Sequence, residues 1–434
     1  MRSNLITVVT AVASVVLVAS VASADQVQEQ FRLMEQRMAE MEDRLEATSD
    51  DLRTARATVD EQQSLLTDAG LVDASDEGLR SAVGSFFDQV NVSGVAAASY
   101  NHRLIKADDP NGGNALFKNP NANTFQVDQI WLTLDKAPTE ESRAGFHAEF
   151  ATGASATVQG DGGGGDGVPY LYSGYVSYLA PVLDGVQVDL GRLGTVLGAE
   201  VVQTNGNFFV TQGAVFGLQP VTYNGVSLGT SITDEISVVA GVVNDVYSDT
   251  MVSADNNKAY FGQVSYGGDA FGLNVGGIIG DSDASVCVQG AFPGQNDCQV
   301  SIVDVVLTAD PTDDLSVWAN FDWVNVNGSD NGPDGNAFGI SGAGRLGITD
   351  TMGIASRIEY INTSSNLTGF ADDSELFTVT GTLDKTLADG LVTRLELRYD
   401  TFLDDNGQGF ALNGDAAGTN DDQLVALWQM YYEF

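Results

Sequence analysis

The chain has 434 residues and is strongly acidic, with 59 Asp and Glu residues against 19 Lys and Arg residues and a net charge of −40. This balance argues against nucleic-acid binding, which requires a basic surface. Beyond residue 24, no stretch approaches the roughly 18 consecutive apolar residues of a membrane helix. If the rest of the chain spans a membrane, it must do so as a closed β-barrel, because only helices and closed barrels satisfy their own backbone in lipid.

Residues 1–24 have the pattern of a secretory signal peptide. Arg2 precedes an apolar stretch over residues 5–21, and residues 22–24 form an A-x-A cleavage site. A transmembrane anchor is the alternative, but the apolar stretch is short and contains several Ser and Thr residues. We therefore expect the mature chain to begin at Asp25 and to be exported.

Residues 25–66 predict an α-helical coiled coil. Apolar residues recur at every seventh position, and Glu, Gln, Arg and Asp fill most of the others. The residues at this repeating position are Phe31, Met38, Leu45, Leu52, Val59 and Leu66. Because the apolar seam is narrow and in strict register, we prefer a coiled coil to a single amphipathic helix packed on the rest of the chain. Residues 67–85 are predicted to form a linker.

From residue 86 the apolar period changes to two residues, which predicts β-strands bounded by Gly, Asn, Asp and Pro. Sixteen strands are expected, at residues 87–103, 124–136, 142–153, 169–180, 185–193, 219–231, 235–244, 258–267, 270–280, 297–309, 314–327, 336–348, 352–362, 374–386, 390–402 and 422–434. Short and long connections alternate, so all the long ones lie at one end. Residues 86–434 therefore predict an all-β fold, a 16-stranded antiparallel transmembrane β-barrel wide enough for an aqueous lumen.

The strands alternate between an apolar face and a polar face. In strand 390–402, Leu395 opposes Arg394, and in strand 314–327, Phe321 opposes Asp322. Full charges would be costly in a dry core, so we expect the polar faces to line the lumen and the apolar faces to meet lipid. Aromatic girdles are expected at strand ends, formed by Tyr170, Tyr172, Tyr175, Tyr178, Trp428, Tyr431, Tyr432 and Phe434.

The C-terminal strand resembles that of a known class of proteins. Residues 424–434 alternate apolar residues and end in Phe434, as in the last strand of outer-membrane barrels, which the barrel assembly machinery recognises. Segments 191–194 and 219–226 resemble the sequence around the inner loop of outer-membrane β-barrel porins. A heptad region before a barrel is similar to trimeric porins with a periplasmic coiled coil. The resemblance implies a homotrimer in the outer membrane of a Gram-negative bacterium, in contact with lipid and lipopolysaccharide.

By this resemblance, the long connection 194–218 folds into the lumen and narrows it, with Glu200 as the acidic group that it presents to the pore. Its many apolar residues support this placement, because an exposed apolar loop would be a liability. A short helix packed between strands is the alternative. The other expected pore-lining residues are Arg143, His147, Glu149, Arg345, Arg357, Glu359, Arg394, Glu396 and Arg398. Pairing of each Arg with a neighbouring Glu is an equally good interpretation of these positions.

Few residues suggest a disulfide, a cofactor or a metal site. Ten residues separate Cys287 from Cys298, and export to an oxidising compartment favours a disulfide between them. No cofactor and no metal site are expected. The Asp- and Asn-rich segments 330–334 and 404–407 could hold Ca²⁺, but solvated loops are the preferred interpretation.

We therefore predict an outer-membrane porin through which ions and small hydrophilic solutes diffuse passively, with selectivity set by charged lumen side chains. The ion preference stays open, with a lean towards cations from the net charge. The main alternative is a structural protein that tethers the membrane to peptidoglycan through the coiled coil. A barrel enzyme is disfavoured, since His102 and His147 are the only histidines and no nucleophile motif accompanies either. A soluble acidic β protein is disfavoured by Phe434.

Overall fold

The computed structural model describes residues 89–104, 123–154, 170–183, 185–247, 258–282, 298–328, 334–364, 374–403 and 422–434. The chain divides into two units, of which the second, Gln89–Phe434, contains all of these residues. The predicted signal peptide, coiled coil and linker fall within residues 1–85 and lie outside the described residues. Among the described residues, no helix has both the length and the apolar character needed to cross a membrane.

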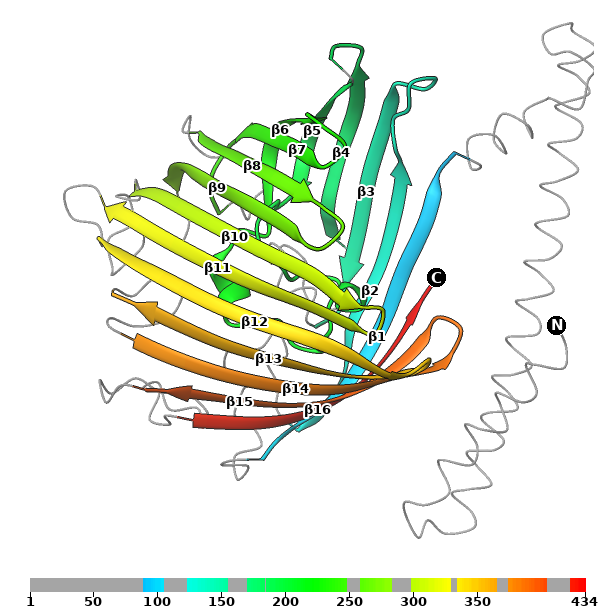
Figure 1. Ribbon diagram of the computed structural model, residues 1–434, viewed down its shortest axis with the longest axis vertical. Helices are drawn as coiled ribbons and strands as arrows, with labels where there is room; N and C mark the ends of the chain where they lie inside the picture. Colours follow the sequence, from blue (N-terminus) through cyan, green and yellow to red (C-terminus); the bar gives the residue numbers. More distant parts are fainter. Residues whose placement is uncertain are drawn as a thin grey trace, which may run out of the picture. The chain divides into compact units, whose positions relative to one another are not determined.

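The described residues of the second unit form a closed antiparallel barrel of sixteen strands, in which each strand pairs with its sequence neighbours and β1 closes on β16 (Figure 1). The strands are β1 (Asn91–Arg103), β2 (Thr124–Lys136), β3 (Ala144–Thr152), β4 (Tyr170–Ala180), β5 (Val186–Gly194), β6 (Thr222–Ser231), β7 (Ile236–Val243), β8 (Ala259–Gly267), β9 (Gly272–Ser282), β10 (Cys298–Thr312), β11 (Leu315–Gly328), β12 (Gly335–Thr349), β13 (Met352–Thr363), β14 (Ser374–Ala388), β15 (Leu391–Phe402) and β16 (Asp422–Glu433).

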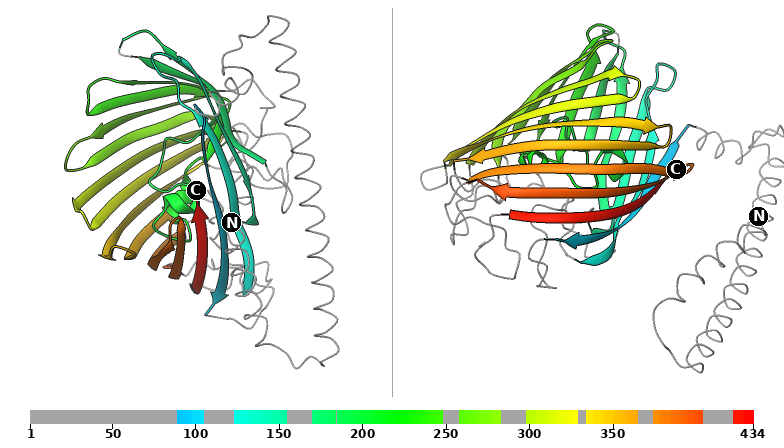
Figure 2. Two further views of the ribbon diagram at one scale, coloured as in Figure 1. Left: turned by 90° about the vertical axis from the view of Figure 1, so that its right-hand side faces the viewer. Right: turned by 60° about the horizontal axis from the view of Figure 1, so that its bottom comes forward.

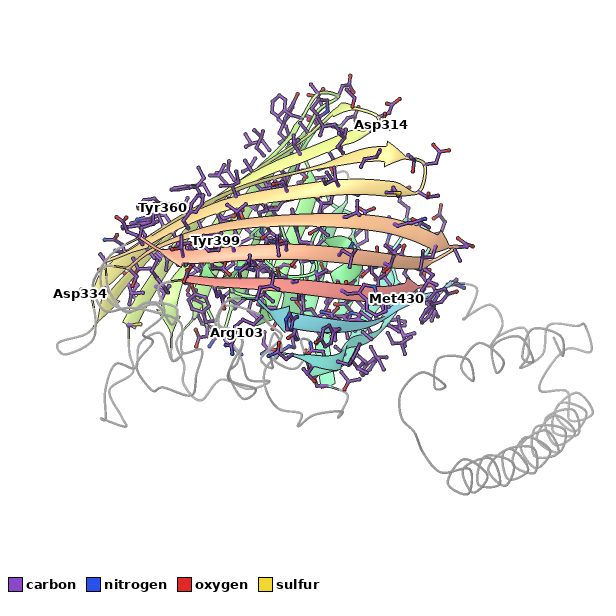
Figure 3. The ribbon with its side chains drawn as sticks, turned by 90° about the horizontal axis from the view of Figure 1, so that it is seen from below. Arg103, Asp314, Asp334, Tyr360, Tyr399 and Met430 are labelled. Carbon is purple, nitrogen blue, oxygen red and sulfur yellow. The ribbon has the colours of Figure 1, made fainter. Side chains whose placement is uncertain are left out.

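This architecture confirms the predicted fold of the barrel. Every predicted strand coincides with a strand of the structure, and the bounds differ by at most four residues. The short connections gather at one end, which we call the turn end, and the long connections at the other, the loop end. Asp314, in the turn between β10 and β11, and Asp334, before β12, mark these two ends in Figure 3.

The orientation of the two strand faces is also as predicted. Leu395 and Phe321 are 55% and 38% exposed, whereas Arg394 and Asp322, their neighbours along the strands, are 5% and 0% exposed. Since successive side chains point to opposite faces of a strand, the apolar residues lie on the outer surface and the charged residues inside the barrel. This is the arrangement of a barrel in lipid rather than of a soluble one.

Three of the residues predicted to form aromatic girdles lie inside the barrel instead, and this part of the prediction is wrong. Tyr172 and Tyr431 are 6% exposed, and the ring of Tyr175 stacks on His147 on the inner face. Tyr178 and Trp428 do lie outside, at 49% and 45% exposure. A bulge in β4 at Tyr172 shifts the alternation there. Tyr175 and Tyr431 lie an odd number of residues from the outward Tyr178 and Tyr432, so regular alternation turns them inward.

The inner face is not polar throughout. On β5 to β14, the inward residues near the loop end are apolar and form one buried cluster with residues from the connection between β5 and β6. Its wall members include Leu193, Tyr223, Val243, Phe261, Ile278, Val300, Ile302, Val324, Val326, Ile361 and Leu376. The barrel therefore encloses a hydrophobic core at its loop end, while its polar inward residues lie mainly at mid-height and towards the turn end.

Candidate functional site: the inner wall and the connection between β5 and β6

The connection between β5 and β6 crosses the interior of the barrel (Figures 1 and 2). It contains two short 3₁₀ helices, η2 (Thr204–Gly206) and η3 (Val215–Leu218). The first contacts β1 and β16, and the second contacts β11, β12 and β13. Residues 195–221 thus reach from their own strands to the opposite wall and back.

Apolar side chains hold one side of this connection against the wall. Leu197, Val215 and Leu218 are 3%, 1% and 0% exposed and belong to the buried cluster at the loop end. Val202 and Phe216 join a second buried cluster that includes residues of β1 to β4 and β16. This packing explains why the segment is rich in apolar residues, since they are removed from water inside the barrel.

Arg357 on β13 is the centre of the polar contacts of the connection. It is fully buried and pairs with Glu200 of the connection at 2.5 Å and with Glu359 of its own strand at 3.1 Å. It also donates to the carbonyl oxygen of Thr211 at 2.9 Å and lies over the ring of Phe209 at 4.5 Å. A guanidinium with several donors can satisfy this many partners at once.

The connection approaches this group closely because residue 213 is glycine. The backbone N–H of Gly213 donates to Glu200 Oε2 at 2.7 Å, and a Cβ at this position would lie 2.1 Å from Glu359 Oε1. Burial raises the pKa of Glu200 above its ordinary value, although the positive charge of Arg357 acts in the opposite direction. The negative charge on Glu200 is therefore held at a cost that its hydrogen bonds only partly offset.

Two further arginines of β15 bind the backbone of the connection. Arg394 donates to the carbonyl oxygens of Thr204, Asn207 and Phe209, at 2.7–3.2 Å. Arg398 donates to the carbonyl oxygen of residue 212 at 2.6 Å and pairs with an aspartate of its own strand at 2.8 Å. Both arginines are at most 5% exposed.

Glu396, between these arginines, accepts hydrogen bonds rather than pairing with either of them in the contacts described. Its carboxylate accepts from the backbone N–H groups of Val210 and Thr211, at 2.6 and 3.1 Å, from the Thr211 hydroxyl at 2.6 Å, and from Thr382 at 2.8 Å. We call the inner face of β13 and β15 with Arg357, Glu359, Arg394, Glu396 and Arg398 the covered wall.

The two ends of the connection meet at a cluster of polar residues on β10 and β11. Asp304 and Asp322 are direct cross-strand partners and are both fully buried. Asn320 donates to Asp304 at 2.7 Å, and Gln219 donates to Asp322 at 2.6 Å. The backbone N–H of Ala199 reaches Asn320 at 3.4 Å, so both ends of the connection are tied to this cluster.

A different group of charges lies on β2 to β5, towards the turn end, and we call it the open wall. His147 contacts Asp135 at 2.9 Å and Glu149 at 3.4 Å, and its ring stacks on Tyr175. Asp189 on β5 accepts from a serine of β4 at 2.6 Å, and Tyr175 lies within electrostatic reach of all three carboxylates. Unlike the covered wall, this surface is partly exposed: 39% for the Asp135 side chain, 17% for His147 and 12% for Glu149.

The open wall touches the connection at one point. Gln203 donates to Glu149 at 3.0 Å, which joins the connection to β3. Beside this contact, a cavity of about 550 Å³ lies between the ends of β1, β2 and β16 and the segment that contains Gln203 and Asn205. Trp131 and Glu433 are among the residues that line it.

Comparison with known proteins identifies the family. The family model described as "Putative beta-barrel porin-2, OmpL-like" matches residues 89–434. The chain belongs to this family. It is a β-barrel porin of the Gram-negative outer membrane. No curated protein matches the chain.

Solved structures with the same fold include three porins with low sequence identity to this one. OmpT of Vibrio cholerae, in a trimer form, is 14% identical, with a TM-score of 0.55, and the match covers 80% of this chain and 99% of OmpT. An anion-selective porin from Comamonas acidovorans is 12% identical, with a TM-score of 0.56 and coverage of 80% and 99%. OprB of Pseudomonas putida is 12% identical, with a TM-score of 0.54 and coverage of 82% and 96%. At this identity the likeness concerns the fold.

The structure places the predicted site residues of the porin in three groups. Glu200, Arg357, Glu359, Arg394, Glu396 and Arg398 lie together beneath or within the connection, while His147 and Glu149 belong to the open wall. Arg345 pairs with Asp384 at 2.7 Å, and Arg143, directly before β3, donates to a backbone carbonyl of β4 at 3.1 Å. Cys298 is disulfide-bonded, but Cys287 lies outside the described residues, so their pairing stays a prediction. The segments 330–333 and 404–407, considered for Ca²⁺, also lie outside them.

Several functional positions of the porin were missing from the predicted set. Asp135 and Asp189 of the open wall, and Asp304 at the base of the connection, were not among the expected pore-lining residues, whereas Asp322 was predicted on a polar face that lines the lumen. The alternation of each strand does place all four on the inner face. The predicted set favoured strands in which Arg and Glu alternate. Asp189 and Asp304 instead stand between apolar neighbours, and Asp135 stands between Leu134 and Lys136.

Proposed function

We propose that this porin is a passive diffusion channel for ions and small hydrophilic solutes, narrowed by residues 195–221. The aqueous path would run between this connection and the partly exposed inner faces of β2 to β9. The observation that carries the proposal is the hydrogen bonding of Arg357, Arg394 and Arg398 to the connection, because it holds that segment across the interior. A connection held in this way sets the width of any path beside it.

The solvent exposure of the inward residues outside the covered wall supports the same proposal. Inward residues of β3 to β5 and β7 to β9 are mostly half-buried, in contrast to the fully buried residues of the covered wall. Half-buried polar side chains inside a barrel of this size suit a water-filled passage. We further propose that the porin assembles as a homotrimer, the form of the OmpT structure with the same fold.

Conductance across planar lipid bilayers tests this function. The refolded full-length porin should give discrete, ohmic single-channel steps. A variant that lacks residues 201–212, the part of the connection bound by the covered wall, should give larger steps because the obstruction is removed. If the folded wild-type barrel does not conduct, or if the deletion leaves the step size unchanged, the connection does not narrow an open path and the proposal fails.

A further inference from the structure

Five arginines inside the described part of the barrel are buried. Arg357, Arg394 and Arg398 are 0–5% exposed, and their donors are directed at the connection or at carboxylates of the wall. Arg192 is 3% exposed and donates to a backbone carbonyl of β4. Arg103 is also fully buried. A solute in the lumen therefore does not meet these guanidinium groups directly.

The accessible charges of the described inner face are mainly negative. Asp135, Glu149 and Asp189 lie around Tyr175 on the open wall, and the side chains of Asp135 and Glu149 are 39% and 12% exposed. The basic residue among them is His147, which is held between two of these carboxylates. Even with His147 protonated, three carboxylates and one imidazolium leave an excess of negative charge.

The accessible basic groups at the turn end do not reverse this balance. Arg345, whose side chain is 37% exposed, forms two hydrogen bonds to Asp384 at 2.7 and 2.8 Å and is neutralised by it. Arg143 and Lys136 lie at the turn between β2 and β3, where they bind a backbone carbonyl of β4 and a serine of the turn. They stand at the rim rather than along the open wall.

We propose that Asp135, Glu149 and Asp189 make this porin selective for cations, and that the arginines of the covered wall do not contribute to selectivity. The inference rests on the proposed channel function, and it assigns the substrate class of that channel. Carboxylates along a narrow, low-dielectric passage raise the local concentration of cations and lower that of anions. Small inorganic cations and small organic ammonium ions are the solutes that fit this field.

Reversal potentials under a KCl gradient test the proposal on the intact porin. The wild type should be permeable to K⁺ over Cl⁻ by about threefold or more. The double variant Asp135→Asn/Asp189→Asn should lower this ratio by about twofold or more, and Asp135→Lys/Asp189→Lys should turn the channel towards anions. Glu149 is left unchanged because it also accepts a hydrogen bond from Gln203 of the connection.

A matched control separates a local effect from a change in net charge. Asp234→Asn/Asp269→Asn removes the same charge from two exposed short turns and should leave the ratio close to that of the wild type. A conducting wild-type channel that prefers Cl⁻, or a ratio that the open-wall variants do not change, would overturn the assignment while leaving the channel function intact. Absence of conductance in every folded variant would instead reject the proposed function itself.

Discussion

The covered wall and the open wall both carry charged residues at inward strand positions, yet they differ in solvent access. On the covered wall, Arg357 and Arg398 are fully buried and bind the connection between β5 and β6. On the open wall, Asp135 and His147 keep 39% and 17% of their side-chain surface exposed. A charged residue that faces the inside of a barrel can thus either hold the connection in place or line the aqueous lumen.

This difference shows that the path of the connection between β5 and β6, rather than the barrel wall, decides which charges a solute meets. The connection uses the wall's arginines as donors to its carbonyl groups and one glutamate, Glu396, as acceptor for its N–H groups. A long connection with only two short 3₁₀ helices needs such partners, because most of its backbone groups would otherwise be buried without hydrogen bonds. The charges left over, on β2 to β5, are those available for transport.

The largest expected effect comes from Arg357 on the covered wall. Arg357→Met should lower the free energy of unfolding by about 3–5 kcal/mol, because Glu200 and Glu359 would remain buried without their cation. It should also make the single-channel current noisier, since the connection loses its central contact. The measurement is urea unfolding in lipid vesicles, followed by loss of the heat-modifiable folded band on SDS gels.

Arg345→Met is the matched control for that variant. Arg345 also pairs with a carboxylate, but its side chain is 37% exposed. Ion pairs of this accessibility contribute about 0–1 kcal/mol, so the control should be much milder. Equal losses for the two variants would show that burial beneath the connection does not distinguish these arginines.

The second effect concerns the apolar contact of the connection with the wall. Leu218→Ala should cost about 2–5 kcal/mol, because Leu218 is fully buried among inward residues of the loop end and its truncation leaves a cavity. Val201→Ala, in the same connection but 44% exposed, should cost far less. Comparable unfolding midpoints for the two variants would contradict a hydrophobic core inside the barrel.

The sequence predicted the barrel well because its signal is local and repeated. Alternation over ten or more residues, as in β13 to β15, defines both the strand and the direction of its faces. The alternation misleads where the inward positions are apolar and the outward ones polar. Val300 and Val324 line the interior although Ser301 and Asn325 face outward, so the usual rule would turn these valines to lipid. These inward apolar side chains are shielded from water by the connection between β5 and β6, and the strand sequence does not reveal the path of that connection.

The site was less predictable than the fold for the same reason. Sequence pattern identified Arg357, Arg394 and Glu200 as inward or connecting residues, but their partners lie 157 to 190 residues away, as for Arg357 with Glu200 and for Arg394 with Thr204. Whether a charge is covered or open depends on the path of the connection, which period-two spacing does not encode.

A smaller effect is expected from the close approach at Gly213. Gly213→Ala should destabilise the porin by about 1–3 kcal/mol, because the added Cβ would overlap Glu359 Oε1 and crowd Glu200. Gly217→Ala provides the control, since nothing lies within 4 Å of a Cβ placed there. The two variants should therefore separate clearly in unfolding midpoint, and a loss at Gly217 as large as that at Gly213 would count against the close approach.

The smallest effect concerns the two aspartates at the base of the connection. They are inward carboxyl groups, like those of the open wall, but they are fully buried. Asp304 and Asp322 are cross-strand neighbours in a fully buried site, and two neighbouring buried carboxylates cannot both be charged without a large cost, so we expect one of them to be protonated. An amide can replace the protonated member, because its NH₂ donates to one neighbour while its oxygen still accepts from Gln219.

Asp322→Asn should therefore change the free energy of unfolding by less than about 1 kcal/mol. It should be less destabilising than Asp322→Ala, which removes the acceptor of the 2.6 Å hydrogen bond from Gln219. It should also leave the K⁺ over Cl⁻ permeability ratio unchanged, because the pair is fully buried. A shift of the ratio as large as that of the open-wall variants would mean that solutes sense charges behind the connection. The distinction between covered and open charges would then be a matter of degree, set by distance across the barrel rather than by contact with water.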